Sequence, residues 1–139
     1  MPLDRQAQIE LLLDRYENPR YKGKLNDAAD VSLEGGNPGC GDILHFYLKF
    51  DGERLEKISF EGEGCTISQA SADILAEMVE GKAIPELEAL GHEKLMEVLG
   101  EEIVQNRTRC AMLSLDTLKL ALRKYREQRV LKARSSNQV

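Results

Sequence analysis

The sequence predicts an α+β fold in which helices pack on one face of a three-stranded antiparallel sheet. Two observations predict it. Three consecutive stretches between residues 29 and 61 alternate apolar and polar side chains, which is the period of a strand with one buried face. After Gly64 the apolar residues recur instead at the spacing of a helix. A sheet buried on one side only is typical of antiparallel strands whose apolar face is covered by helices.

The first expected element is an N-terminal helix between Leu3 and Tyr16. Its apolar residues recur at helical spacing, and they are Ile9, Leu12, Leu13 and Tyr16. Asn18-Pro19 should end this helix, because the residue before a proline is pushed out of the α region.

The three strands should follow directly. The first alternates through Ala29, Val31 and Leu33. The second places four apolar side chains on one face, namely Leu44, Phe46, Leu48 and Phe50. Asp51-Gly52 predicts a tight hairpin turn. The third stretch, 54–61, puts Ile58 and Phe60 on its inner face. These strands would form a meander with one apolar side.

A well-marked helix should follow the sheet. Thr66 with Gln69 three residues later is a capping-box pattern, so we expect the helix to start at Thr66. Its apolar and small residues keep the i, i+3, i+4, i+7 spacing as far as Val79, and Gly81 should stop it.

The rest of the chain should be helical. Two short helices are expected at 84–90 and 93–99, each delimited by glycine or proline, and a long helix at about 107–129. We expect one domain over residues 1–134, which fits the usual domain size, and a disordered tail over 135–139.

Composition narrows the classes of function. The net charge of −5 opposes a protein that binds nucleic-acid phosphates, and aromatic residues for base stacking are few. No apolar run approaches the roughly 18 residues of a membrane span, and the N-terminus has no signal-peptide pattern. An odd set of three cysteines fits a reducing compartment. We therefore expect a cytoplasmic protein that binds neither nucleic acid nor membrane.

The C-terminal end of the chain is strongly basic. From Lys119 onward there are seven basic residues and one acidic residue. Basic residues are favourable near the C-terminus of a helix, where the macrodipole is negative. This pattern is consistent with a solvated helix end and also with a surface that docks onto an acidic partner.

The three cysteines all lie at the ends of expected elements. Cys40 lies in a loop between two strands, Cys65 at a strand-to-helix junction and Cys110 near the start of the last helix. Asp42 lies two residues after Cys40. Three thiolates and one carboxylate would supply the four ligands of a tetrahedral zinc ion. The residues alone leave metal binding and three ordinary cytosolic thiols both open.

Two of the cysteines have surroundings that favour the thiolate. Cys65 directly precedes a helix N-terminus, where the positive end of the dipole stabilises an anion. Cys110 has Arg107 and Arg109 close in sequence, and nearby cations also favour a thiolate. We interpret the two arginines as supporting residues of the site.

These motifs resemble the U-type iron–sulfur assembly proteins, the IscU and SufU family. The similarity covers about residues 15–121. It rests on the segments Tyr16-Glu17-Asn18-Pro19-Arg20, Asn37-Pro38-Gly39-Cys40-Gly41-Asp42, Phe60-Glu61-Gly62-Glu63-Gly64-Cys65-Thr66-Ile67-Ser68 and Arg107-Thr108-Arg109-Cys110-Ala111. Arg109 stands where IscU-type members have a histidine, and the Leu-Pro-Pro-Val-Lys stretch of those members is absent. Arg107 three residues before Cys110, with a basic residue directly before the cysteine, resembles the SufU pattern. The interval from Cys65 to Cys110 is as short as in IscU.

The resemblance implies a SufE/IscU-like fold for a single U-type assembly domain and a zinc-dependent acceptor of sulfur, rather than a stand-alone enzyme. A cysteine desulfurase of the SufS or IscS type would donate a persulfide sulfur. By its match to the first cysteine of the family, Cys40 would accept that sulfur. Cys65, Cys110 and Asp42 would meanwhile hold the zinc.

Two alternatives remain. The same three cysteines could hold a labile [2Fe–2S] cluster on a scaffold that passes it to downstream assembly or acceptor proteins. A purely structural zinc site is the third possibility, and it would make the fold depend on every ligand.

Overall fold

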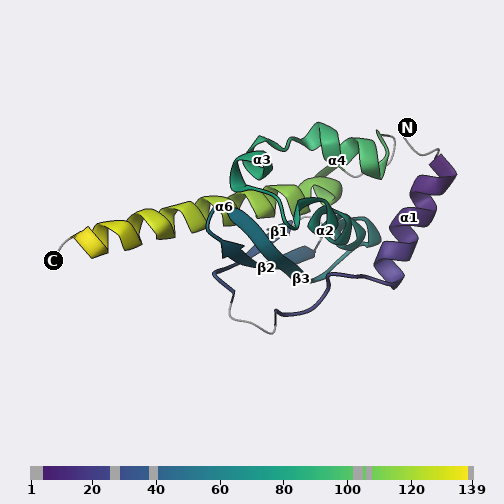
Figure 1. Ribbon diagram of the computed structural model, residues 1–139. Helices are drawn as coiled ribbons and strands as arrows, with labels where there is room; N and C mark the ends of the chain where they lie inside the picture. Colours follow the sequence, from purple (N-terminus) through teal and green to yellow (C-terminus); the bar gives the residue numbers. More distant parts are fainter. Residues whose placement is uncertain (1–4, 26–28, 38–40, 102–104, 106–107, 138–139) are drawn as a thin grey trace.

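In the computed structural model, the structure describes residues 5–25, 29–37, 41–101, 105 and 108–137 (Figure 1). The elements follow the expected order. They are α1 (Arg5–Glu17), β1 (Val31–Asn37), β2 (Asp42–Asp51), β3 (Arg54–Glu63), α2 (Thr66–Val79), α3 (Ile84–Ala89), α4 (His92–Leu99) and α6 (Thr108–Asn137).

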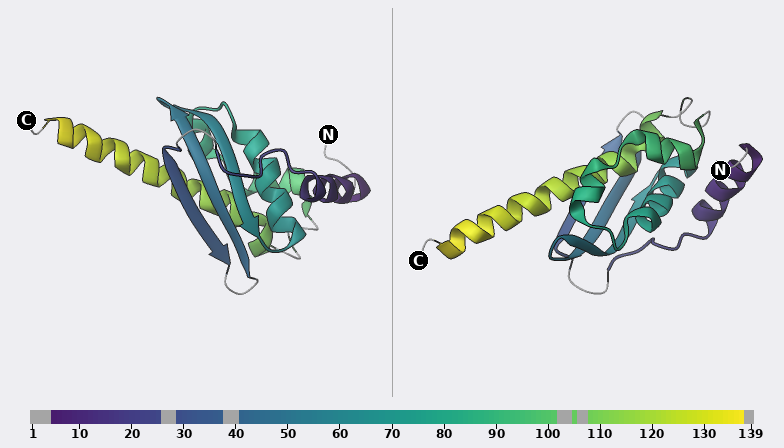
Figure 2. Two further views of the ribbon diagram at one scale, coloured as in Figure 1. Left: turned by 90° about the horizontal axis from the view of Figure 1, so that it is seen from below. Right: turned by 45° about the horizontal axis from the view of Figure 1, so that its top comes forward.

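The three strands form one antiparallel sheet in the order β1-β2-β3, which confirms the predicted architecture. Figure 2 shows the helices gathered on one face of this sheet. The side chains of β2 alternate as predicted. Those on the helical side are buried, and they are Leu44, Phe46, Leu48 and Phe50. His45 and Tyr47 lie on the other face, half-buried, with ring centroids 4.7 Å apart.

The β2–β3 hairpin contains a tight turn and a bulge. Asp51 pairs with Arg54, and Gly52 between them has the positive φ of 62° that such short turns need. The register shifts after Lys49, because Lys49 faces Lys57 whereas the next residue of β2 faces Leu55. The extra residue in β3 lets both Leu55 and Ile58 point into the core.

Two helices cover the sheet. α6 packs against β1 and β2, and α2 packs against β2, β3 and α6. The largest fully buried side chains of this layer include Phe46, Phe60, Leu75, Leu115 and Leu118. None of the helices that the structure describes is long and apolar enough to cross a membrane.

The strand β1 differs from the expectation at both ends. It begins at Val31 rather than Ala29 and continues beyond the expected alternation, through Gly35 and Gly36, to Asn37. The reason is the approach of α6. A Cβ atom at Gly35 would lie 2.1 Å from Oγ1 of Thr117, so glycine lets the helix lie directly on the strand.

The last helix extends further than expected, to Asn137 instead of about Arg129. Its C-terminal part projects beyond the rest of the molecule, at the end opposite to α1 (Figures 1 and 2). The assignment of a single domain over 1–134 with a disordered tail over 135–139 stays a prediction.

The helix α1 is attached to the body through a fully buried carboxylate. Asp73, in the middle of α2, accepts a hydrogen bond from Nη1 of Arg15 at 2.6 Å. Its other oxygen accepts from the backbone N–H groups of Arg20 and Tyr21, both at 2.8 Å. The segment that follows α1 then pairs with the edge of β3, where Gly23 donates to the carbonyl of Phe60 at 2.7 Å.

We predict that Asp73→Ala lowers the free energy of unfolding by about 3–5 kcal/mol, the usual cost of breaking a buried ion pair. Two backbone N–H groups would lose their acceptor, and among the described residues Arg15 would keep Glu77 alone as an ion-pair partner. Asp116→Ala is the matched control, because it removes an exposed pair with His92 worth about 0–1 kcal/mol. Urea denaturation measures both. Equal losses in the two variants would contradict the structural role given to Asp73.

Candidate metal centre

Three element ends converge at one edge of the fold. Asp42 opens β2, Cys65 precedes α2, and Cys110 lies in the first turn of α6. One carboxylate oxygen of Asp42 and the two Sγ atoms all lie within 4.8 Å of one another. Asp42 and Cys110 are buried, and Cys65 is half-buried. Neither cysteine is in a disulfide. The structure therefore brings together three of the four residues named as ligands from the sequence.

A glycine allows Asp42 to approach the strand-to-helix junction. Gly64 has a φ of 135°, and a Cβ atom there would lie 2.1 Å from Oδ1 of Asp42. The backbone N–H of Cys65 donates to the same oxygen at 2.7 Å. Oδ2 lies 3.7 Å from Sγ of Cys65. One oxygen is thus bound by the backbone, and the other is directed to the thiols.

Cys65 is the N-cap of α2. Its Sγ accepts a hydrogen bond from the backbone N–H of Ser68 at 3.5 Å, and the Ser68 hydroxyl donates to the Cys65 carbonyl at 3.0 Å. The capping box expected of Thr66 and Gln69 is therefore wrong, although Thr66 is the first helical residue. Gln69 is buried, and its amide donates to the Ser68 hydroxyl instead. The Ser68 N–H thus fixes the position of the Cys65 sulfur at the start of α2.

A residue outside the expected set fixes Cys110 relative to Cys65. The hydroxyl of Ser71, on the second turn of α2, donates to the carbonyl of Ala111 at 2.9 Å. Both residues are fully buried where α2 and α6 touch. The signal in the sequence is the run of small residues Ala70-Ser71-Ala72, which lets two helices approach closely.

The donor set fits zinc. Zinc takes thiolate and carboxylate ligands, and in a tetrahedron Zn–S bonds of about 2.3 Å and Zn–O bonds of about 2.0–2.2 Å place a sulfur and an oxygen ligand roughly 3.5–3.7 Å apart. The distance of 3.7 Å between Cys65 Sγ and Asp42 Oδ2 is of that size. Cys40 and Arg107 lie outside the described residues. Arg109 is exposed on the first turn of α6. The full ligand set and the supporting role of the two arginines stay predictions.

The sequence profile of the NifU-like N-terminal domain matches residues 8–132 of this chain. The chain belongs to this family. The family assignment confirms the resemblance seen in the cysteine motifs, and the match includes all three cysteines and Asp42.

Several named relatives are similar in sequence and in structure. The zinc-dependent sulfurtransferase SufU of Bacillus subtilis is 45% identical over 75 residues, which are 54% of this chain and 50% of that protein. The iron–sulfur cluster assembly scaffold protein IscU of Thermotoga maritima is 35% identical over 83% of this chain and 92% of its own length. The crystal structure of a putative scaffold protein for the SUF system from Fervidobacterium islandicum has a TM-score of 0.68 and 32% identity, and the match covers 81% of this chain and 94% of that one.

We predict that Gly64→Ala weakens zinc binding at least about tenfold, the usual scale for losing a residue that orients a metal ligand. The added Cβ would displace the Asp42 carboxylate. Gly23→Ala is the matched control, because Gly23 has a similar φ of 131° but has no atom within 4 Å of its Cβ position. Backbone strain should lower the free energy of unfolding of both variants by about 1–3 kcal/mol. Competition with a chromophoric chelator measures the affinity. Equal zinc affinities in the two variants would refute the positioning role of Gly64.

Proposed function

We propose that this chain serves iron–sulfur cluster biogenesis as a zinc-dependent acceptor of persulfide sulfur. The observation that carries the proposal is the convergence of Asp42, Cys65 and Cys110 in a member of the NifU-like N-terminal domain family. The similarity to a relative named as a zinc-dependent sulfurtransferase supports the choice of zinc. The donor would be a cysteine desulfurase of the SufS or IscS type. The cytoplasm suits this chemistry, because it keeps thiols reduced.

The metal ligands would be Cys40, Asp42, Cys65 and Cys110. Bound zinc keeps thiols deprotonated at neutral pH and protects them from oxidation. Asp42 already has one oxygen occupied by the Cys65 N–H, which favours coordination through the other oxygen alone. A carboxylate is a weaker ligand of zinc than a thiolate. Asp42, Cys65 and Cys110 would hold the zinc ion while the thiol of Cys40 leaves it to accept sulfur.

The transfer step uses Cys40 as the acceptor. Its thiolate attacks the outer sulfur of the persulfide on the desulfurase. The new sulfur–sulfur bond forms on Cys40, the old one breaks, and the cysteine of the donor leaves as a thiolate. No external oxidant or reductant is needed, because one persulfide replaces another. Downstream assembly or acceptor proteins would then take the sulfur.

The test is the release of alanine from cysteine by a SufS-type desulfurase. The zinc-loaded chain should stimulate the rate at least severalfold, and Cys40→Ala should abolish the stimulation. Radiolabelled sulfur from the substrate should appear on the peptide that contains Cys40. If the folded, zinc-loaded chain neither stimulates the desulfurase nor becomes labelled, the sulfur-acceptor function is wrong.

A second candidate function is a scaffold for a [2Fe–2S] cluster. It is favoured by the similarity to a scaffold protein named IscU over nearly its whole length. Thiolates suit iron–sulfur ligation, and a single carboxylate ligand would make a cluster labile enough to pass on. Anaerobic addition of iron and sulfide followed by transfer to an apo-ferredoxin distinguishes this function, because a sulfur acceptor alone would not complete that transfer.

We predict that Cys40→Ser keeps the fold intact, in contrast to a purely structural zinc site. A protein that depends on a structural zinc site unfolds when any ligand is lost, because the free energy of metal binding stabilises the fold. Here the core is formed by Phe46, Phe60 and Leu115, which lie in the packed layers between sheet and helices. Circular dichroism and the urea midpoint measure the outcome. Loss of cooperative unfolding in Cys40→Ser would favour the structural site.

A further inference from the structure

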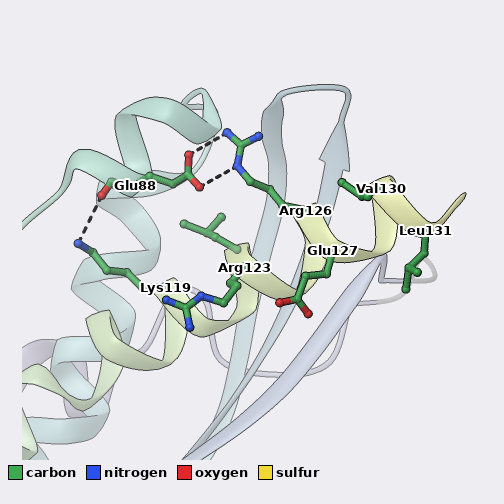
Figure 3. Close-up of a pocket in the computed structure, with 8 residues that line it drawn as sticks. Glu88, Lys119, Arg123, Arg126, Glu127, Val130 and Leu131 are labelled. Atoms are coloured by element: carbon green, nitrogen blue, oxygen red, sulfur yellow. Dashed lines mark hydrogen bonds and ion pairs between the residues drawn. The ribbon is translucent and has the colours of Figure 1, made fainter. Parts of the chain in front are cut away.

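A groove of about 630 Å³ runs along the C-terminal half of α6, beside α3 (Figure 3). Its apolar wall is formed by Leu122, Val130 and Leu131. Leu122 is buried, whereas Val130 and Leu131 are 51% and 63% exposed. Figure 3 labels the latter two on α6, and the C-terminal part of this helix projects from the molecule (Figure 1). Exposed apolar side chains that line a groove are typical of a surface that takes up another helix.

The polar wall of the groove has an excess of positive charge. Arg126 donates two hydrogen bonds to the carboxylate of Glu88, at 2.7 and 2.8 Å, and these bonds lower the pKa of Glu88. Lys119 donates to the Glu88 carbonyl, so its charge is not neutralised there. Among the residues that the structure describes, Arg123 has no ion-pair partner. The remaining acid is Glu127. The groove therefore favours an occupant with an apolar centre and acidic flanks.

The exposed face of α1 has that pattern. Leu13 is 46% exposed, and Glu10 and Glu17 lie three residues before it and four residues after it, on the same face of the helix. Asp14 lies four residues after Glu10 and three before Glu17, so the three acidic residues form one exposed row beside Leu13. The opposite face of α1 is fixed to the body through Leu12 and Arg15. The acidic face is thus held in a defined orientation and is not needed for the packing of its own chain.

We propose that α1 of a second copy of this chain docks in the groove between α3 and α6. α1 and the projecting part of α6 lie at opposite ends of the molecule, so a chain cannot fill its own groove (Figures 1 and 2). Two copies placed antiparallel about a two-fold axis would each insert one α1 and receive one, which closes the assembly as a dimer. Direct pairing of two α6 helices is disfavoured, because each carries the same excess of basic residues.

Sedimentation velocity on the full chain tests the dimer over a concentration series up to several hundred micromolar. We expect a monomer–dimer equilibrium that weakens as salt is raised, because about 1 M salt reduces the Debye length to about 3 Å. A monomer at every concentration overturns the proposal. That result would instead favour an acidic helix of a different protein as the occupant of the groove.

Three leucine variants locate the contact. Leu13→Asp and Leu131→Asp should each raise the dissociation constant at least tenfold. Leu120→Asp is the matched control, because Leu120 is 52% exposed on the same helix but does not line the groove. It should leave the dissociation constant within twofold of the unaltered chain. A loss of the dimer in Leu120→Asp equal to that in Leu131→Asp would contradict the assigned groove.

Mixing the two impaired variants provides the decisive measurement. Leu131→Asp keeps an intact α1 face, and Leu13→Asp keeps an intact groove. Neither variant can form either contact with itself, but a mixed pair can form one. We expect the mixture to associate more tightly than each variant alone, and labelling one of them with a dye reports the mixed species. A mixture no tighter than the separate variants overturns the proposal. Thermal unfolding confirms that each variant is folded, and none of these measurements depends on zinc or sulfur transfer.

Discussion

The buried carboxylate of Asp73 connects α2 to the end of α1 and to the segment that follows α1. Its two oxygens accept from Arg15 and from two consecutive backbone N–H groups at Arg20 and Tyr21. Through these bonds α2 holds the end of α1, and the segment after α1 is aligned with the edge of β3. A buried charge is costly unless it is fully paired, so this arrangement tolerates few alternatives. Both the orientation of the outer face of α1 and the position of α2, whose N-cap is Cys65, depend on it.

Much of the fold could be predicted because its signals are local. The alternation in β2 and the change to helical spacing after Gly64 fix which residues face the core, and the structure buries those residues. Three residues of the metal centre could also be predicted from the sequence. Cys65, Cys110 and Asp42 lie at ends of elements, where a compact fold brings chain segments together, and the family motifs indicated which ends meet.

The parts that sequence reasoning missed depend on contacts between distant residues. Asp73 sits within a helical pattern, and nothing near it in the sequence shows that its partners lie more than fifty residues away. The place of Gly35 within β1 was not predicted, because the reason for a glycine there is the approach of Thr117 from α6. Cys65 was overlooked as a cap because sulfur is not among the usual capping groups. The groove along α6 likewise exists only once α3 packs beside it.

The close contact between Gly64 and the Asp42 carboxylate also limits how this chain can evolve. Any side chain at 64 would collide with the carboxylate of Asp42 and also with the Cα atom of Asp42, which would lie 2.8 Å from the new Cβ atom, so a smaller side chain at 42 would not make room for it. A smaller residue at 42 would in turn remove an oxygen that the Cys65 N–H requires. The glycine at 64 is therefore required by the backbone of residue 42 as well as by its carboxylate. In lineages of this family that keep the carboxylate, the glycine should be retained with it.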